Sequence, residues 1–164
     1  MLKRTPYFFI WIPFFLLTAC GNYDFTVNEK RVYTQKPLFS EFDVPDPALY
    51  ACLKQAIIDE KVTSAIQLTR LNCSHAGIED LQGLATFSGL TQLKLSSNTI
   101  LNLHQITGLT VLDKLYLDNN VVVDPVPLYK LPALRLLDLS GNSALQCPTR
   151  SAFSTLESVK LPDH

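Results

Sequence analysis

Residues 90–117 read LTQLKLSSNTILNLHQITGLTVLDKLYL, with the spacing L-x-x-L-x-L at both ends. Leu93 and Leu115 hold the same place in these two copies and lie 22 residues apart. The pattern continues at this period in both directions, which indicates a chain of stacked structural repeats. Its five copies are Leu68/Leu71/Cys73, Leu90/Leu93/Leu95, Leu112/Leu115/Leu117, Leu134/Leu137/Leu139 and Leu156/Val159/Leu161.

The repeats also share an asparagine three residues past the third apolar position, and an apolar residue two further on. These pairs are Asn98/Ile100, Asn120/Val122 and Asn142/Ala144. A side-chain amide both donates and accepts, so it can satisfy backbone groups that the turn out of a strand leaves unpaired. Position 76 holds alanine, which fits a first repeat that borders a cap.

This template resembles the leucine-rich repeat, and its 22-residue length resembles the short class of internalin-like bacterial proteins. The resemblance implies an α/β solenoid of four full coils and a fifth strand, with a parallel sheet on the concave side. Alternate side chains of an extended segment share a face, so Leu93 and Leu95 should point inward while Gln92 and Lys94 point outward. No coil can bury its own apolar side, so the core forms only by stacking.

An amino-terminal capping helix is predicted over residues 46–60, just before the first repeat. Asp46 is a favourable N-cap and Pro47 suits the first turn. The end coil would otherwise expose its core to water, so residues 46–164 should form one leucine-rich-repeat domain that includes this cap. Apolar residues follow at helical spacing, namely Leu49, Cys52, Leu53, Ala56 and Ile57.

Residues 1–19 have the features of a lipoprotein signal peptide. Lys3 and Arg4 precede an apolar run over residues 7–17. This run is too short for a membrane-spanning helix, which takes about 20 residues, although an uncleaved anchor remains the alternative. Leu17-Thr18-Ala19-Cys20 resembles the lipobox of bacterial lipoproteins, which implies cleavage before Cys20 and attachment of lipid to it.

The lipobox resemblance also implies an address in the bacterial cell envelope. Two or three acyl chains would hold the protein firmly in a membrane. In Gram-negative lipoproteins an aspartate after the cysteine favours retention at the inner membrane. Gly21 occupies that place here, so the outer membrane is the expected location.

Residues 20–45 are predicted to be a tether or an extension packed on the domain, because aromatic residues are numerous for a free linker. The alternation Tyr23/Phe25/Val27 and Val32/Tyr33 around Asn28-Glu29 predicts a hairpin. Without residues 1–19 the chain has 12 basic and 15 acidic side chains, a formal charge near −3. Nucleic acid is therefore not an expected partner.

Three cysteines remain for an oxidising compartment once Cys20 is assigned to lipid. Cys52 lies on the inward face of the cap helix and Cys73 replaces the inward leucine of the first strand, so these two faces should meet. A disulfide closing this loop of about 21 residues would stabilise the domain by about 3 kcal/mol. Two packed thiols are the alternative, and Cys147 is left without a predicted partner.

No metal, cofactor or catalytic site is expected. His75, His104 and His164 fall at unrelated places in the repeat, and no C-x-x-C or H-x-x-x-H spacing occurs. The sequence also contains neither a G-x-S-x-G elbow nor a glycine-rich phosphate loop. An enzyme is therefore not expected.

The outward strand positions form columns whose members lie about 4.8 Å apart from coil to coil. The concave sheet is the usual binding surface of leucine-rich repeats, so the resemblance points to these columns. Tyr116 is the best single anchor for a protein partner, because its side chain is large and amphipathic. A solvated face of mixed charge is the alternative. The candidate partner-binding residues are Arg70, Lys94, Lys114, Tyr116, Asp118 and Asp138.

A second candidate surface is an apolar ridge of Leu101, Val123 and Leu145, the residues that follow the inward positions. Either residues 23–42 pack on this ridge, or the ridge is itself an interaction site.

Together these features predict a lipid-anchored envelope protein that presents a leucine-rich-repeat module to a protein partner. The alternative is a structural envelope lipoprotein that associates weakly with its own kind through the uncovered edge of the fifth strand, over residues 156–161.

Overall fold

The computed structural model describes residues 25–27, 30–34, 36–146, 153–154 and 156–162. The chain divides into two compact units, Met1–Lys36 and Pro37–His164. The lipobox around Cys20 lies outside the described residues, as does Cys147. None of the helices in the described part of the chain has the length and apolar character needed to span a bilayer.

The first unit contains the hairpin that the sequence predicts. Strand β1 (Phe25–Val27) pairs antiparallel with β2 (Lys30–Tyr33), with an irregularity in register between Phe25 and Thr26. Residues 28–29, which separate the two strands in sequence, lie outside the described residues.

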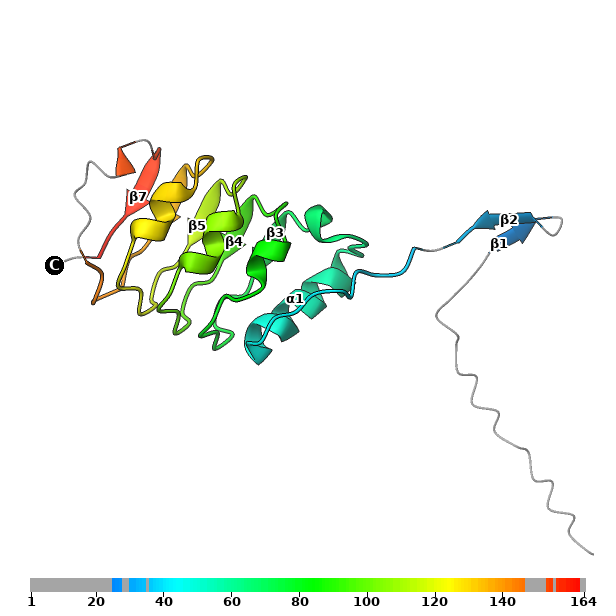
Figure 1. Cartoon of the computed structure of the whole chain (residues 1–164), viewed down its shortest axis with the longest axis horizontal. Coiled ribbons are helices and arrows are strands. Elements are labelled where there is room, and N and C mark those ends of the chain that lie inside the picture. The colour runs from blue at the N-terminus through cyan, green and yellow to red at the C-terminus, as the bar shows by residue number, and fades with distance from the viewer. Residues whose placement is uncertain (1–24, 28–29, 35, 147–152, 155, 163–164) are drawn as a thin grey trace, which may run out of the picture. The chain divides into compact units, whose positions relative to one another are not determined.

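The second unit contains a parallel sheet of five three-residue strands in sequence order. The course of the chain through this sheet can be followed in Figure 1. Every neighbouring pair is in register at one repeat length, so that Leu71 lies beside Leu93, and Leu93 beside Leu115. The expected leucine-rich-repeat solenoid is therefore confirmed. The strands are β3 (Arg70–Asn72), β4 (Gln92–Lys94), β5 (Lys114–Tyr116), β6 (Leu136–Asp138) and β7 (Ser158–Lys160).

Short 3-10 helices return the chain to the next strand and close the core on the side opposite the sheet (Figure 1). Leu84, Ile106 and Leu128 of these helices are buried against the inward leucines of the strands. One continuous core therefore runs through all the coils, as stacking requires. The helices are η1 (Ala65–Gln67), η2 (Leu84–Thr86), η3 (His104–Gly108) and η4 (Val126–Lys130).

Helix α1 (Pro47–Asp59) covers the first coil with Leu49, Leu53 and Ile57, which are almost fully buried. Asp46 caps this helix, because its Oδ1 accepts hydrogen bonds of 2.9 Å from the backbone N–H groups of Ala48 and Leu49. The expected capping helix is therefore present.

The Asp46 carboxylate also joins the cap to the first repeat. Its Oδ2 accepts hydrogen bonds from the backbone N–H groups of Glu79, at 2.9 Å, and Asp80, at 3.0 Å. Burial alone would raise the pKa of Asp46, but these four backbone donors together hold that pKa below its ordinary value.

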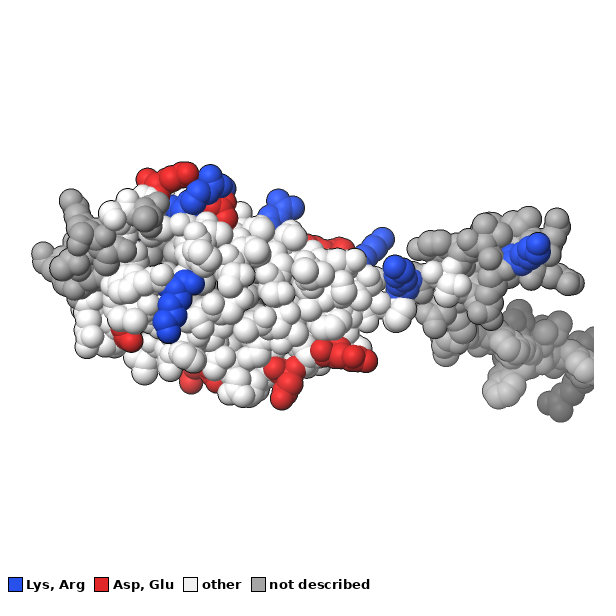
Figure 2. All heavy atoms as spheres, turned by 45° about the horizontal axis from the view of Figure 1, so that its top comes forward, with Lys and Arg blue, Asp and Glu red and all other residues white. Residues whose placement is uncertain are grey.

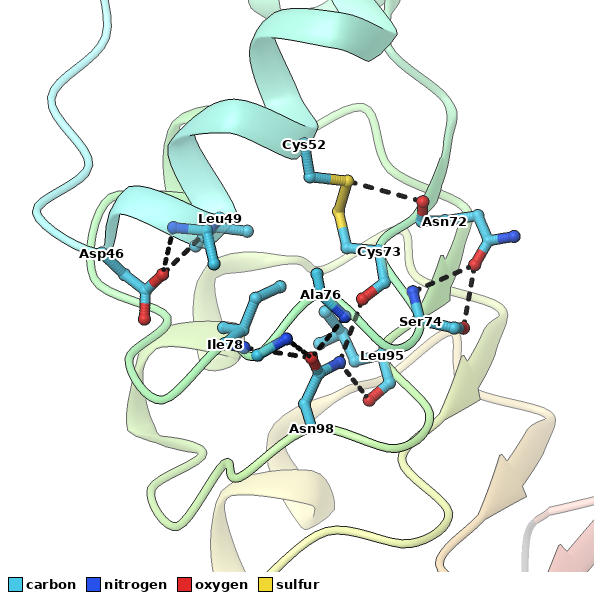
Figure 3. The surroundings of a disulfide bond; sticks show 12 residues. Asp46, Leu49, Cys52, Asn72, Cys73, Ser74, Ala76, Ile78, Leu95 and Asn98 are labelled. Carbon is cyan, nitrogen blue, oxygen red and sulfur yellow. Dashed lines mark hydrogen bonds between the residues drawn. A yellow bond between two sulfur atoms is a disulfide. The ribbon is translucent and has the colours of Figure 1, made fainter.

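A disulfide joins Cys52 of α1 to Cys73 after β3, across a sequence separation of 21 residues (Figure 3). The predicted bridge is therefore confirmed, and the alternative of two packed thiols is wrong. Cys73 is buried in the core, which places the covalent link where the cap helix meets the first coil.

The asparagine ladder is present, and each amide serves the preceding coil as well as its own. Figure 3 shows Asn98, whose Oδ1 accepts from the backbone N–H groups of Ala76, Gly77 and Ile78 at 2.9 to 3.1 Å. Its Nδ2 donates to the carbonyl oxygen of Cys73 at 3.0 Å. Each ladder asparagine therefore forms hydrogen bonds with backbone groups of the coil before its own.

The fourth coil departs from the expected register after Asn142. Ala144 was expected in the core, but it is exposed, and Leu145 is buried at 5% exposure in its place. The equivalent core positions hold Ile100 and Val122, both fully buried, so a larger side chain than alanine fills this site better. One extra residue in the turn brings leucine inward.

The predicted apolar ridge is therefore wrong as a three-residue surface, because Leu145 belongs to the core. Leu101 remains 56% exposed and Val123 is half-buried. Phe39 and Phe42 belong to the segment that was expected to pack on the ridge, but their rings pack edge-on against Phe87 at centroid distances of 5.9 and 5.4 Å. These two aromatics thus cover the core beside the cap helix.

Candidate partner-binding face

The strand face consists of the outward side chains of β3 to β7, together with the side chain two positions after the last residue of each strand. These side chains point away from the core because their neighbours in sequence point into it. The strand face consists of Arg70, Asn72, Ser74, Gln92, Lys94, Ser96, Lys114, Tyr116, Asp118, Leu136, Asp138, Ser140, Ser158, Lys160 and Pro162.

Tyr116 occupies the centre of the strand face and is half-buried. Lys94 lies beside it in register, with its Nζ 5.2 Å from the centroid of the Tyr116 ring. A cation at this distance from a ring face is attracted by the ring quadrupole. The aromatic ring is therefore held by a neighbour and still presents surface to a partner.

Asp138 differs from the other candidate residues because it is only 7% exposed. Its Oδ1 accepts from the Ser140 hydroxyl at 2.6 Å, and its Oδ2 lies 3.1 Å from the Nζ of Lys160. Burial alone would raise the pKa of Asp138, but these hydrogen bonds outweigh burial and lower it. In turn, Asp138 raises the pKa of Lys160. This carboxylate already has its partners within the protein.

Asp118 has polar neighbours and forms no ion pair with a described residue, although its charge helps to raise the pKa of Lys160. The hydroxyl of Ser96 donates to its Oδ1 at 2.5 Å, and Nδ2 of Asn119 donates to its Oδ2 at 3.1 Å. Both contacts orient the carboxylate without neutralising its charge. Asp118 therefore offers the strand face a negative group that is not held in an ion pair.

A charged ladder lies beside the strand face, one position before the strands. The guanidinium of Arg135 binds both oxygens of Asp113, through Nε at 2.6 Å and Nη2 at 3.0 Å, and reaches Glu157 at 3.3 Å. The hydrogen bond from Arg135 is the main cause that lowers the pKa of Asp113. These side chains are engaged with one another across three coils.

A shallow depression of about 180 Å³ lies at the cap end of the strand face. Basic and amide side chains dominate its lining, and one carboxylate, that of Glu60, contributes to it. Its lining residues are Glu60, Arg70, Leu71, Asn72, Gln92 and Lys94.

Sequence reasoning placed all six candidate residues on one face but missed their neighbours. Gln92 and Glu60 were not expected to line a depression with Arg70, and Ser140 was not expected to hold Asp138. A signal for the last contact exists in the sequence. A serine stands two residues after the polar strand residue in both Asn72–Ser74 and Asp138–Ser140, and both pairs form the same hydrogen bonds.

Outside the strand face, an apolar hollow of about 400 Å³ is lined by Leu101, Leu103, Val123 and Pro127 together with Asn102 and Asp124. Among the described residues, no three His, Cys, Asp or Glu side chains converge as a metal site would require. On the face that Figure 2 shows, broad uncharged surface separates most of the charged side chains. The strand face is thus the place where charged, aromatic and amide groups meet in fixed register.

Solved bacterial leucine-rich-repeat structures are similar to this chain. An internalin from Listeria monocytogenes matches with a TM-score of 0.60 and 21% identity, over 70% of this chain and 42% of its own. A leucine-rich-repeat protein from Leptospira interrogans matches with a TM-score of 0.53 and 25% identity, over 58% of this chain and 26% of its own. This chain thus spans less than half the length of either. No protein-family model matches the sequence, and neither does any curated protein.

Proposed function

We propose that this protein is a non-enzymatic, lipid-anchored protein of the bacterial cell envelope that presents its strand face to a protein partner. The observation that carries the proposal is the position of Tyr116 at the centre of that face. Its ring contacts Lys94 and contributes nothing to the buried core, so it is available as an aromatic anchor. The similarity to bacterial leucine-rich-repeat structures supports a module that presents a surface for binding.

Replacement of Tyr116 tests the binding proposal. Purified wild-type protein and the Tyr116→Ala variant should be used to capture proteins from solubilised envelopes of the source bacterium. Tyr129→Ala is the matched control, because Tyr129 is 44% exposed on η4, away from the strand face. A distinct partner should be recovered by wild type and by the control, and lost with Tyr116→Ala. Equal recovery by all three proteins, or recovery of no partner by wild type, contradicts the proposal.

The anchor at Cys20 is a separate part of the proposal and has its own test. Cells expressing wild type or Cys20→Ser should be labelled with a radioactive fatty acid. Label should enter the wild-type protein only, because the thiol of Cys20 is the expected attachment site. Equal labelling of both proteins would exclude lipid at this position. Fractionation of the labelled membranes then tests the outer-membrane address.

Self-association is the second candidate function, and β7 is the observation that favours it. Among the described residues β7 pairs only with β6, through the backbones of Ser158 and Lys160. The backbone of Val159 alternates with these and points away from β6, where another strand could pair with it. Sedimentation velocity should show a fraction of dimer that increases with protein concentration. A monomer at every concentration contradicts this candidate.

A further inference from the structure

Three cations of the strand face surround a single neutral side chain. Gln92 lies between Arg70 on β3 and Lys114 on β5, because both are its partners in register. Lys94 lies two residues further along the same strand as Gln92, and so on the same face. Neighbouring parallel strands are about 4.8 Å apart, so the cluster spans about 10 Å from β3 to β5.

None of these three cations forms an ion pair with a described residue. The ion pairs of the described residues are made by Arg135, with Asp113 and Glu157, and by Lys160, with Asp138. The described residues therefore place their other strand-side cations in ion pairs and leave this cluster without one. Two carboxylates lie near the cluster. Glu60 lines the same depression as Arg70 and Lys94, and Asp113, which Arg135 binds, has its pKa lowered in part by Lys114.

The sign of this cluster opposes that of the chain as a whole. The full sequence has 14 basic and 15 acidic side chains, a formal charge of −1. Three cations without an ion pair within about 10 Å therefore form a local positive patch, and such patches attract anionic surfaces and orient their approach. Folding alone gives no reason for placing like charges together, since their mutual repulsion disfavours it.

We propose that the protein partner binds the strand face with an acidic peptide segment, whose carboxylates lie against Arg70, Lys94 and Lys114 beside the Tyr116 ring. This inference rests on the proposed function and names the chemistry of its partner. A segment of about three extended residues matches the roughly 10 Å from β3 to β5. Gln92, at the centre, supplies an amide that donates to a carboxylate or to the peptide backbone.

Binding of a model acidic peptide tests the inference directly. Fluorescein-labelled octaglutamate should be titrated with the full chain in mild detergent and followed by fluorescence anisotropy, with octaglutamine and octalysine as peptide controls. Octaglutamate should bind and the other two should not. The affinity should fall about two- to fivefold for each of Arg70→Gln, Lys94→Gln and Lys114→Gln, and at least about tenfold for the triple variant.

Matched substitutions separate this patch from the charge of the whole protein. Lys130→Gln removes one positive charge from η4, away from the strand face, and should leave octaglutamate binding unchanged. Glu60→Gln removes the carboxylate of the depression and should strengthen binding. Raising the salt concentration should weaken binding to wild type and have little effect on the triple variant.

The outcomes distinguish the inference from the proposed function. Failure of wild type to bind octaglutamate at low salt, or equal binding by wild type and the triple variant, overturns the acidic segment. An envelope partner lost with Tyr116→Ala but retained by the triple variant would overturn the inference while the proposed function stands. Loss of that partner with both variants supports the two together.

Discussion

Single asparagine side chains determine how the second, third and fourth coils leave their strands. Oδ1 of Asn120 accepts from the backbone N–H of Ile100 at 3.1 Å, and its Nδ2 donates to the carbonyl oxygens of Leu95 and Leu117 at 2.9 and 3.0 Å. All of these groups are buried, so water cannot replace the amide. The residue therefore links two coils through their backbones.

Asn120→Ala should lower the free energy of unfolding by about 1 to 3 kcal/mol, because it leaves the buried N–H of Ile100 without a partner. It also removes one of the two side-chain amides that donate to the carbonyl oxygens of Leu95 and Leu117, which keep Asn98 and Asn142. Asn102→Ala is the matched control. Its exposed side chain accepts one hydrogen bond, from the N–H of His104, so its loss should change the free energy of unfolding by less than about 1 kcal/mol. Denaturant melts measure both values, and a similar loss in the two variants would argue against the ladder.

The residue before each ladder position has a left-handed backbone in every coil. His75, Ser97, Asn119 and Gly141 have φ between 55° and 75° and are spaced at the repeat period. Glycine adopts this region without steric penalty, and asparagine does so more readily than most residues. The period thus fixes a backbone conformation that His75 and Ser97 adopt at a penalty.

Ser97→Gly should raise the free energy of unfolding by about 0.5 to 1 kcal/mol, because removal of Cβ relieves the left-handed strain by more than the added chain entropy costs. Ser97→Val should lower it, since β-branched side chains tolerate this region poorly. Thermal melts of the two variants compare these effects. A Gly variant no more stable than the Val variant would show that the position is not strained.

At the scale of elements, the cap helix is held to the first coil by one carboxylate and one disulfide. Asp46 accepts from four backbone N–H groups, two in α1 and two near Glu79. Its pKa is lower in the folded chain than in the unfolded one. The stabilisation that this carboxylate gives is therefore complete above the unfolded pKa and is lost as pH falls through the folded pKa.

Asp46→Asn should lower the free energy of unfolding at neutral pH by about 1 to 3 kcal/mol, because the amide nitrogen cannot accept from the N–H groups of Glu79 and Asp80. The wild-type protein should lose stability as pH falls below about 4, the ordinary range of an aspartate. The variant should lose less over that interval, since it has no carboxylate there to protonate. Urea melts between pH 7 and pH 2 measure these losses. An equal loss of stability with falling pH in the two proteins would contradict the role of Asp46.

The elements also show what periodicity predicts and what it cannot. The spacing of Leu71, Leu93 and Leu115 fixed the parallel register, because inward and outward side chains alternate along any strand. The same period predicted Ala144 in the core, but one extra residue in the turn places the larger side chain of Leu145 there instead. A period describes average spacing, whereas packing volume decides such local insertions.

The candidate face was predictable as a set of positions but not as a set of available charges. Register alone placed Lys94, Tyr116 and Asp138 in one column. The neutralisation of Asp138 by Lys160 depends on the direction in which a long side chain crosses from one coil to the next. No spacing rule specifies that direction. Packing of Phe42 on Phe87 was likewise invisible, since the two are far apart in sequence.

In the whole molecule, the buried core and the proposed binding face lie on the two sides of the same short strands. Inward side chains such as Leu115 are fully buried and form the core, whereas their outward neighbours form the strand face. Under the proposed function, partner binding can therefore vary through outward positions without disturbing the fold. This division depends wholly on the assigned register, because a shift of one residue would exchange the two sets.

The most direct test of this register compares Leu115→Ala with Lys114→Ala in denaturant melts. Leu115 is fully buried at the centre of the core, so its truncation should lower the free energy of unfolding by about 2 to 5 kcal/mol. Lys114 lies next to it on the outward face, so its truncation should change that free energy by no more than about 0.5 kcal/mol. Equal destabilisation by the two substitutions would contradict the register, and with it both the core and the candidate face.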